Sequence, residues 1–185
     1  FRIGVEHIIF GYDHLLFVLG LVLLVRPRQL LATVTAFTVA HSITLAASAL
    51  GGVSLPGPPV EITIAMSIAL LGAEAIYRMR GRETLAQTMP WLIAFGFGLV
   101  HGFGFAGALS ESGLPPGAEV MALLLFNLGV EAGQVAFVLV LLALAWIGRH
   151  LYRPGGPAVR TAAAYAIGIT GSYWAIERIA ATFFF

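Results

Sequence analysis

Six long apolar segments dominate this sequence, and a short break rich in charge, proline or glycine separates each from the next. They cover residues 5–25, 30–50, 60–77, 90–110, 120–147 and 161–184. A membrane-spanning helix needs about 20 mostly apolar residues, and backbone groups inside lipid must be satisfied within the helix itself. The sequence therefore predicts an all-α polytopic integral membrane protein, with six transmembrane helices in one bundle and residues 1–185 forming a single domain.

The composition supports a membrane protein and removes several soluble classes. Hydrophobic residues make up 59% of the chain and charged residues only 10%, whereas a soluble domain is about a quarter charged. A cytosolic globular enzyme and a disordered tail are therefore excluded. The formal net charge of +1 gives no field that would attract a nucleic acid. Because the chain has no cysteine, it offers no disulfide framework, thiolate metal site or cysteine nucleophile.

The arginines of the breaks predict the orientation of the chain. The first, third and fifth breaks contain Arg26, Arg28, Arg78, Arg80, Arg82, Arg149, Arg153 and Arg160, whereas the second and fourth contain no basic residue. Loops that carry Lys and Arg tend to lie in the cytoplasm, so we expect both termini on the outer side. An outward amino end on a chain that begins with Phe1 predicts that a signal peptide or an upstream segment has been removed.

Ionisable side chains occur inside the predicted spans, where each costs a few kcal/mol to insert and is by default a functional candidate. They are Glu6, His7, Asp13, His14, His41, Glu61, Glu74, His101 and Glu131, and the polar Ser42, Ser67, Asn127 and Gln134 accompany them. Four of these residues, on four different spans, lie at a depth of about 13 Å from the outer end, at about 1.5 Å per residue: His14, His41, His101 and Asn127. This common level predicts one polar centre in the outer half of the bundle.

Spacing along the helices brings some of these residues onto common faces. His7 and His14 are seven residues apart, which is two helical turns, with Gly11 between them. One further polar stripe, at positions i, i+4 and i+7, consists of Asn127, Glu131 and Gln134.

Imidazole and carboxylate groups without sulfur favour a divalent transition metal such as nickel, cobalt or zinc, and copper fits less well. The candidate ligands are His7, Asp13, His14, His41, His101 and Glu131. Residues that would orient these ligands or line a path are Glu6, Ser42, Glu61, Ser67, Asn127 and Gln134. Spacing alone does not separate ligands from the residues that orient them.

Several functions remain open from the residues alone. We favour transport of the metal ion, with capture at the outer mouth and passage inward along the polar groups. An intramembrane metal-dependent hydrolase acting on a lipid or a peptide is the alternative, with Asp13 or Glu131 as the general base. A metal-free pair of Ser42 or Ser67 with a histidine from another helix is a third possibility, and a metal sensor or chaperone is a fourth.

Several sequence blocks resemble the HupE/UreJ family, and its second subgroup most closely. They are EHIIFGYDHLLF at residues 6–17, FTVAHSITL at 37–45, Val60-Glu61 with Ser67, FGLVHGFGFA at 97–106 and FNLGVEAGQ at 126–134. The resemblance implies a multi-pass protein of the bacterial inner membrane, a nickel or cobalt permease or metal-handling protein. The outer side, where the arginine distribution places the amino terminus, is then the periplasm. The resemblance further implies hydrogenase or urease accessory roles, with metalloenzyme maturation proteins as partners beside the lipid bilayer and the ion. By position, His7, Asp13 and His14 correspond to the proposed metal motif of the family.

Overall fold

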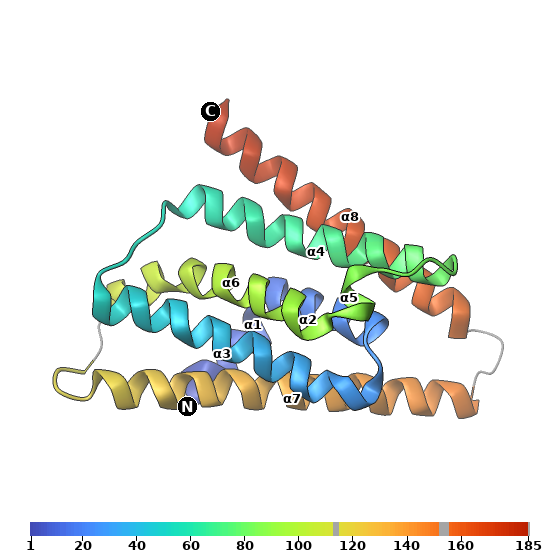
Figure 1. Cartoon of the computed structure of the whole chain (residues 1–185), viewed down its shortest axis with the longest axis horizontal. Coiled ribbons are helices and arrows are strands. Elements are labelled where there is room, and N and C mark those ends of the chain that lie inside the picture. The colour runs from blue at the N-terminus through green and yellow to red at the C-terminus, as the bar shows by residue number, and fades with distance from the viewer. Residues whose placement is uncertain (113–114, 152–155, 185) are drawn as a thin grey trace.

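The computed structural model describes residues 1–112, 115–151 and 156–184, except for the side chains of residues 106–112, 149 and 151. Throughout this part the regular elements are helices, and it contains no strand. They are α1 (Arg2–Phe10), α2 (Tyr12–Leu24), α3 (Pro27–Gly51), α4 (Gly57–Met79), α5 (Leu85–Thr88), α6 (Pro90–Ser112), α7 (Glu119–Leu151) and α8 (Gly156–Phe183) (Figure 1). The predicted all-α class is confirmed. Arg153 and the side chain of Arg149 lie outside the described residues.

The long helices coincide with the predicted apolar segments. By length and apolar composition, α3, α4 and α7 can each cross a membrane, and the bent pair α1 and α2 makes a fourth candidate span if it counts as one. The apolar part of α6 for which side chains are described, Pro90–Phe105, is shorter than a full span. The structure thus gives a helical membrane protein with three to four candidate spans.

The first predicted span is not one continuous helix. α1 and α2 meet at Gly11 with a bend of 75°. The Gly11 N–H still donates to the carbonyl of His7 at 3.0 Å, and the Gly11 carbonyl accepts from the N–H of Leu15 at 3.0 Å. A Cβ at position 11 would lie only 2.5 Å from the His7 carbonyl oxygen and 3.0 Å from His14 Nδ1. Glycine therefore permits a corner that any other residue would crowd.

Close backbone contacts at glycines hold the long helices in pairs. Small residues allow such approach between membrane helices, where there is no hydrophobic driving force between helices. The pairs with the most extensive contact are α1 with α7, α3 with α6, and α4 with α8. The glycines at these crossings are Gly4 and Gly129, Gly98 and Gly102, and Gly72, Gly168 and Gly171. The crossing of α3 and α6 positions two histidines of the site described below.

Arginine side chains bind the C-terminal end of α2. The last carbonyls of a helix have no partner within it, and a cation there also complements the helix dipole. Arg78 Nη1 on α4 donates to the carbonyls of Leu23 at 2.7 Å and Leu24 at 2.5 Å. Arg160 Nη2 on α8 donates to the Leu23 carbonyl at 3.4 Å. Three helices are therefore joined at this end.

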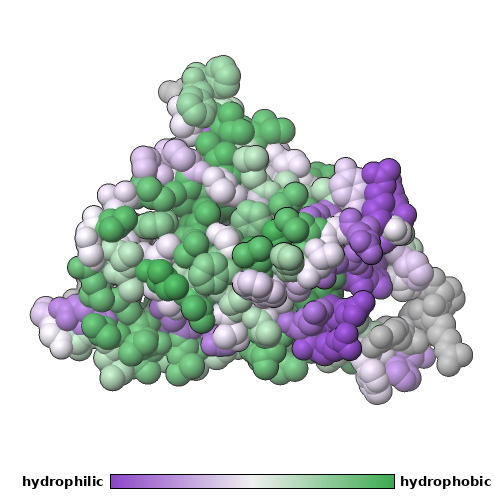
Figure 2. Space-filling view, in the orientation of Figure 1, coloured by the Kyte–Doolittle hydropathy of each residue, from purple (hydrophilic) through white to green (hydrophobic). Residues whose placement is uncertain are grey.

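Hydrophilic residues gather at the same end of the molecule. Figure 2 shows them at the right of the view, beyond a broad hydrophobic surface that covers the helices. The exposed arginines of the first and third breaks belong to this end: Arg26, Arg28, Arg80 and Arg82. A hydrophobic belt with a basic end is typical of a protein that lies in a membrane.

Candidate metal centre

Four histidines from four helices converge inside the bundle. The ring centroid of His14, in the first turn of α2, lies 4.6 Å from that of His7 on α1, 6.1 Å from that of His41 on α3 and 5.0 Å from that of His101 on α6. His14, His41 and His101 are buried and His7 is partly buried. In a straight helix, residues seven apart are about 10.5 Å apart along the axis, so the corner at Gly11 brings His7 against His14.

Two overlapping sets of candidate metal-ligating atoms result from this convergence. Within each set, one ligating atom from every residue lies within 4.8 Å of the others. The first set comprises His7, His14 and His41, and the second comprises Asp13, His14 and His101. His14 belongs to both sets and is the geometric centre of the site.

Hydrogen bonds fix the orientation of His14 and His41. The Nδ1 atom of His14 lies 3.0 Å from Asp13 Oδ1, which accepts its proton. The Nδ1 atom of His41 lies 3.1 Å from Asn127 Oδ1 on α7, and Asn127 Nδ2 donates to the Leu123 carbonyl at 2.9 Å. Because the amide oxygen can only accept, we assign the proton of His41 to Nδ1. The lone pair of Nε2 on each ring is then available to a metal ion.

His101 is oriented by a serine on a neighbouring helix. Ser67 Oγ on α4 donates to the Ile64 carbonyl at 2.7 Å and lies 3.3 Å from His101 Nε2. Since the hydroxyl proton is directed at the carbonyl, the ring must donate from Nε2, which leaves a lone pair on Nδ1. This arrangement does not favour Ser67 as a nucleophile, because the adjacent imidazole is a donor rather than a base.

The remaining ring nitrogens are buried and have no hydrogen-bond partner among the residues that the structure describes. They are His7 Nε2, His14 Nε2, His41 Nε2 and His101 Nδ1. A buried polar atom without a partner lowers folding stability by about 1–3 kcal/mol. Four such atoms in one place would therefore strongly destabilise a cluster that had only a structural role. A bound cation would satisfy several of these lone pairs at once.

A cavity of about 270 Å³ connects the centre to the surface. Its lining includes His7, Asp13, His14 and His101 on one side and Glu61 and Arg178 on the other. The side chain of Glu61 is 57% exposed, so the cavity opens where α4 begins. Arg178 Nε lies 3.5 Å from Glu61 Oε2, and Arg178 Nη1 donates to the Glu61 carbonyl at 3.1 Å.

Aromatic rings enclose the other sides of the histidine cluster. Phe17 and Phe37 are fully buried, and their ring centroids lie 5.3 Å and 5.1 Å from that of His101. The stacked pair of Phe105 and Phe126, with centroids 4.9 Å apart, lies against His7. Phe17 and Phe37 belong to the apolar core cluster that also contains Leu21, Leu24 and Leu71, so apolar packing closes the centre on this side.

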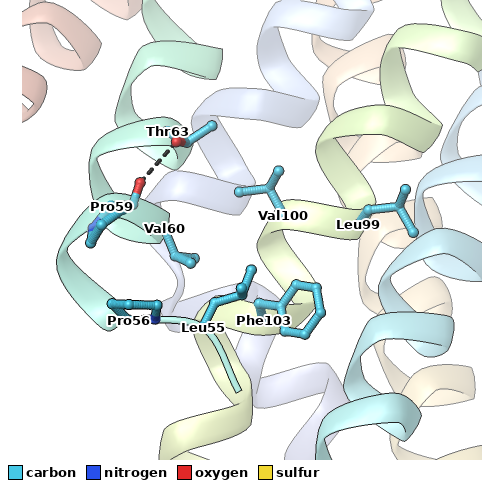
Figure 3. A pocket seen from close by; sticks show the side chains of 8 residues that line it. All are labelled: Leu55, Pro56, Pro59, Val60, Thr63, Leu99, Val100 and Phe103. Carbon is cyan, nitrogen blue, oxygen red and sulfur yellow. Dashed lines mark hydrogen bonds between the residues drawn. The ribbon is translucent and has the colours of Figure 1, made fainter. Parts of the chain in front are cut away.

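A second cavity, of about 260 Å³, lies between α4 and α6 and has a different character (Figure 3). Its one polar side chain, Thr63, donates to the carbonyl of Pro59 at 2.8 Å, as the dashed line shows. The rest of its lining is apolar: Leu55, Pro56, Pro59, Val60, Leu99, Val100 and Phe103. It offers no metal ligand and is not the candidate site.

Other predicted residues lie away from the histidines. Glu6 Oε1 accepts from Arg2 Nε at 2.6 Å at the exposed face of α1. Ser42 Oγ donates to the Thr38 carbonyl of its own helix at 2.6 Å. Glu131 and Gln134 accept from Thr35 Oγ1 at 2.5 Å and from Thr38 Oγ1 at 2.9 Å. Among the described side chains of the α7 stripe, only Asn127 forms a hydrogen bond with a histidine of the centre.

Sequence reasoning missed two features of this region. The α7 stripe has a matching stripe on α3, whose spacing of three residues was a readable signal: Thr35, Thr38 and His41. Arg178 was not among the predicted site residues, but the structure pairs it with Glu61. No local pattern predicts that contact, which joins residues 117 positions apart.

A model of the HupE / UreJ protein family matches residues 1–178, which include all four converging histidines, Asp13, Glu61 and Arg178. The chain belongs to the HupE/UreJ family. No curated protein and no solved structure matches it. Membership of the HupE/UreJ family confirms the predicted resemblance and implies a nickel or cobalt transport or accessory role.

For this HupE/UreJ protein, replacing Asn127 with leucine is expected to weaken Ni²⁺ binding. The change removes the acceptor that fixes the tautomer of His41, and loss of such an orienting partner typically costs about 10–100-fold in metal affinity. Isothermal titration of purified protein with Ni²⁺ measures the effect. Gln134→Leu is the matched control, because it removes a buried α3–α7 hydrogen bond without contact to a histidine. Equal affinities of the two variants would contradict the assigned role of Asn127.

Proposed function

We propose that this HupE/UreJ protein carries Ni²⁺ or Co²⁺ across the bacterial inner membrane from the periplasm. In this proposal the ion is the cargo, and His7, Asp13, His14, His41 and His101 hold it during passage. Neutral imidazoles with one carboxylate suit borderline divalent ions. Family membership supports nickel or cobalt in particular.

The observation that carries the proposal is the pattern of side-chain neighbours around the imidazole nitrogens, from which we assign their protons. Three rings donate one N–H to a neighbouring side chain, Asp13, Asn127 or Ser67, and keep the other nitrogen free. Histidines that bind metals are oriented in the same way, by an acceptor on the nitrogen that does not bind. A cluster that served packing alone would pair its nitrogens with one another or with backbone groups.

The membrane topology of the proposal has six spans, with both termini in the periplasm. α6 and α8 complete the set formed by the α1–α2 pair, α3, α4 and α7. The end that carries Arg26, Arg28, Arg80 and Arg82 then faces the cytoplasm, and Glu61 and the cavity mouth face the periplasm. The ion would reach the centre from outside.

The proposal assigns the structure to an outward-open state. The cavity leads from Glu61 to the histidines, whereas Phe17 and Phe37 pack beyond the histidines within an apolar core. A cation cannot cross that core without rearrangement, because an unpaired charge in an apolar interior is strongly disfavoured. Transport therefore requires a second state in which this packing opens. Glu131 and Gln134, which line up with Thr35 and Thr38 on the inner side of Asn127, are candidates for the continuing path.

Uptake of Ni²⁺ into proteoliposomes tests this function. Purified protein is reconstituted into liposomes that contain a Ni²⁺-sensitive dye. Ni²⁺ is then added outside the liposomes, with no other transition metal present. We expect time-dependent quenching with the wild type and with His150→Ala, since His150 is exposed and bonds the carbonyl of Trp146. We expect none with His7→Ala. Stoichiometric Ni²⁺ binding without uptake by the wild type would contradict transport and favour a hydrolase or a sensor.

A further inference from the structure

Arg178 and Glu61 form an ion pair at the mouth of the cavity, and both side chains line the cavity that contains His7, Asp13 and His14. Among the described residues of that lining, Arg178 is the single arginine or lysine, and the acidic groups are Glu61 and Asp13. The pair thus places a fixed positive charge between the periplasmic surface and the proposed metal ligands.

We propose that the guanidinium of Arg178 competes with the incoming metal ion for the carboxylate of Glu61. This competition thereby sets the affinity of the cavity mouth for the ion. The inference deepens the proposed function and rests on it. When the ion binds Glu61, the guanidinium must leave the carboxylate. When the ion moves on to the histidines, Arg178 returns to Glu61 and closes the mouth behind it.

The geometry suits a contact that breaks and forms again. The Arg178–Glu61 distance of 3.5 Å is longer than that of a tight ion pair, and the two side chains are 29% and 57% exposed. Such an exposed pair contributes little to stability, so separating it costs little. Trp174, one turn earlier on α8, already lies beside the guanidinium, with Arg178 Cζ 5.9 Å from its ring centroid, and can keep contact with it when it leaves Glu61.

The pair is not needed to hold α8 against α4. Their crossing is made by backbone contact at Gly72, Gly168 and Gly171, with Ala65 and Ala69 opposite Gly171. α8 can therefore keep its place when Arg178 moves or is replaced.

Ni²⁺ titration of purified full-length protein in detergent tests the competition. Arg178→Gln is expected to lower the Kd for Ni²⁺ about fivefold, and Glu61→Gln to raise it by a similar factor, both at the upper end for an exposed charge pair. Arg178→Lys keeps the charge and should stay close to the wild type. The double variant Glu61→Gln/Arg178→Gln should bind Ni²⁺ no more tightly than Glu61→Gln alone, because Arg178 has no carboxylate to compete for once Glu61 is replaced. The Ni²⁺ on-rate of Arg178→Gln should also fall more steeply with added salt.

A second exposed ion pair on the same protein provides the control. Arg2 and Glu6 form the comparable exposed pair on α1, outside the cavity, so Arg2→Gln should leave the Ni²⁺ affinity unchanged. A folded Arg178→Gln variant with unchanged or weaker affinity would overturn the inference, as would a lower Tm with the same Kd, which marks a purely structural contact. Failure of the wild type to bind Ni²⁺ would instead overturn the proposed function, and the inference with it.

Discussion

Replacing His14 with alanine is expected to abolish Ni²⁺ binding, with a larger loss than any other single substitution in the centre. His14 is common to both sets of ligating atoms, so its removal leaves each set with two members. We expect the affinity to fall by more than about a hundredfold, which is the upper end of the loss for a residue that only orients a ligand. Equilibrium dialysis of purified protein against Ni²⁺ measures the change.

The controls for His14 separate a shared ligand from a general effect on the fold. His41→Ala and His101→Ala each reduce one set only, so we expect intermediate affinities. At a Ni²⁺ concentration of 100 times the Kd, bound metal should stabilise the wild type by about 2.7 kcal/mol and leave His14→Ala unaffected in thermal denaturation. Wild-type affinity in a folded His14→Ala variant would contradict the centre.

Replacing Gly102 with leucine is expected to have the largest effect on folding. A Cβ at this position would lie 2.5 Å from the His41 carbonyl oxygen and would clash with Thr44 Oγ1. Backbone atoms of a packed helix cannot move aside cheaply, so α3 and α6 must separate. We expect a loss of about 3 kcal/mol or more, at the upper end for overpacked sites. Thermal denaturation in detergent measures it.

Gly96→Leu is the matched control on the same helix. A Cβ at Gly96 meets nothing within 4 Å, so the larger side chain extends into open space. We expect the Tm of this variant to equal that of the wild type or to exceed it slightly, because glycine is the poorer helix former. Equal destabilisation by the two substitutions would show that helix propensity, rather than the close crossing, determines the cost. Gly102→Leu should also lose Ni²⁺ binding, since the crossing positions His41 and His101.

The sequence predicts the long helices well, because their signal is length and apolarity. The predicted segments 30–50 and 60–77 correspond to α3 (Pro27–Gly51) and α4 (Gly57–Met79), within three residues at each end. The corner at Gly11 was not predictable in this way. An isolated glycine is tolerated within a helix, and the 75° bend depends on what α1 and α2 pack against.

The sequence indicates which residues belong to the candidate site, but it does not indicate how their side chains contact one another. Depth along separate helices placed His14, His41 and His101 at one level, and the structure brings these three together. Glu131 was grouped with them by its spacing from Asn127. Residues of one helical stripe lie at different heights along the helix, however, and Glu131 lies against Thr35 instead of the histidines. The contact of Arg178 with Glu61 depends on the angle at which α8 crosses α4, which glycine packing sets and a single sequence does not encode locally.

The corner between α1 and α2 has a consequence for how firmly an ion is held. His7 and His14 extend from two half-helices that meet at one corner, so the distance between their rings depends on the angle of that corner. Bonds from imidazole nitrogen to a metal such as zinc are about 2 Å long and tolerate little stretching. Straightening the span by even part of its 75° would pull one donor out of reach. The angle at Gly11 therefore determines whether His7 and His14 can bind the same ion.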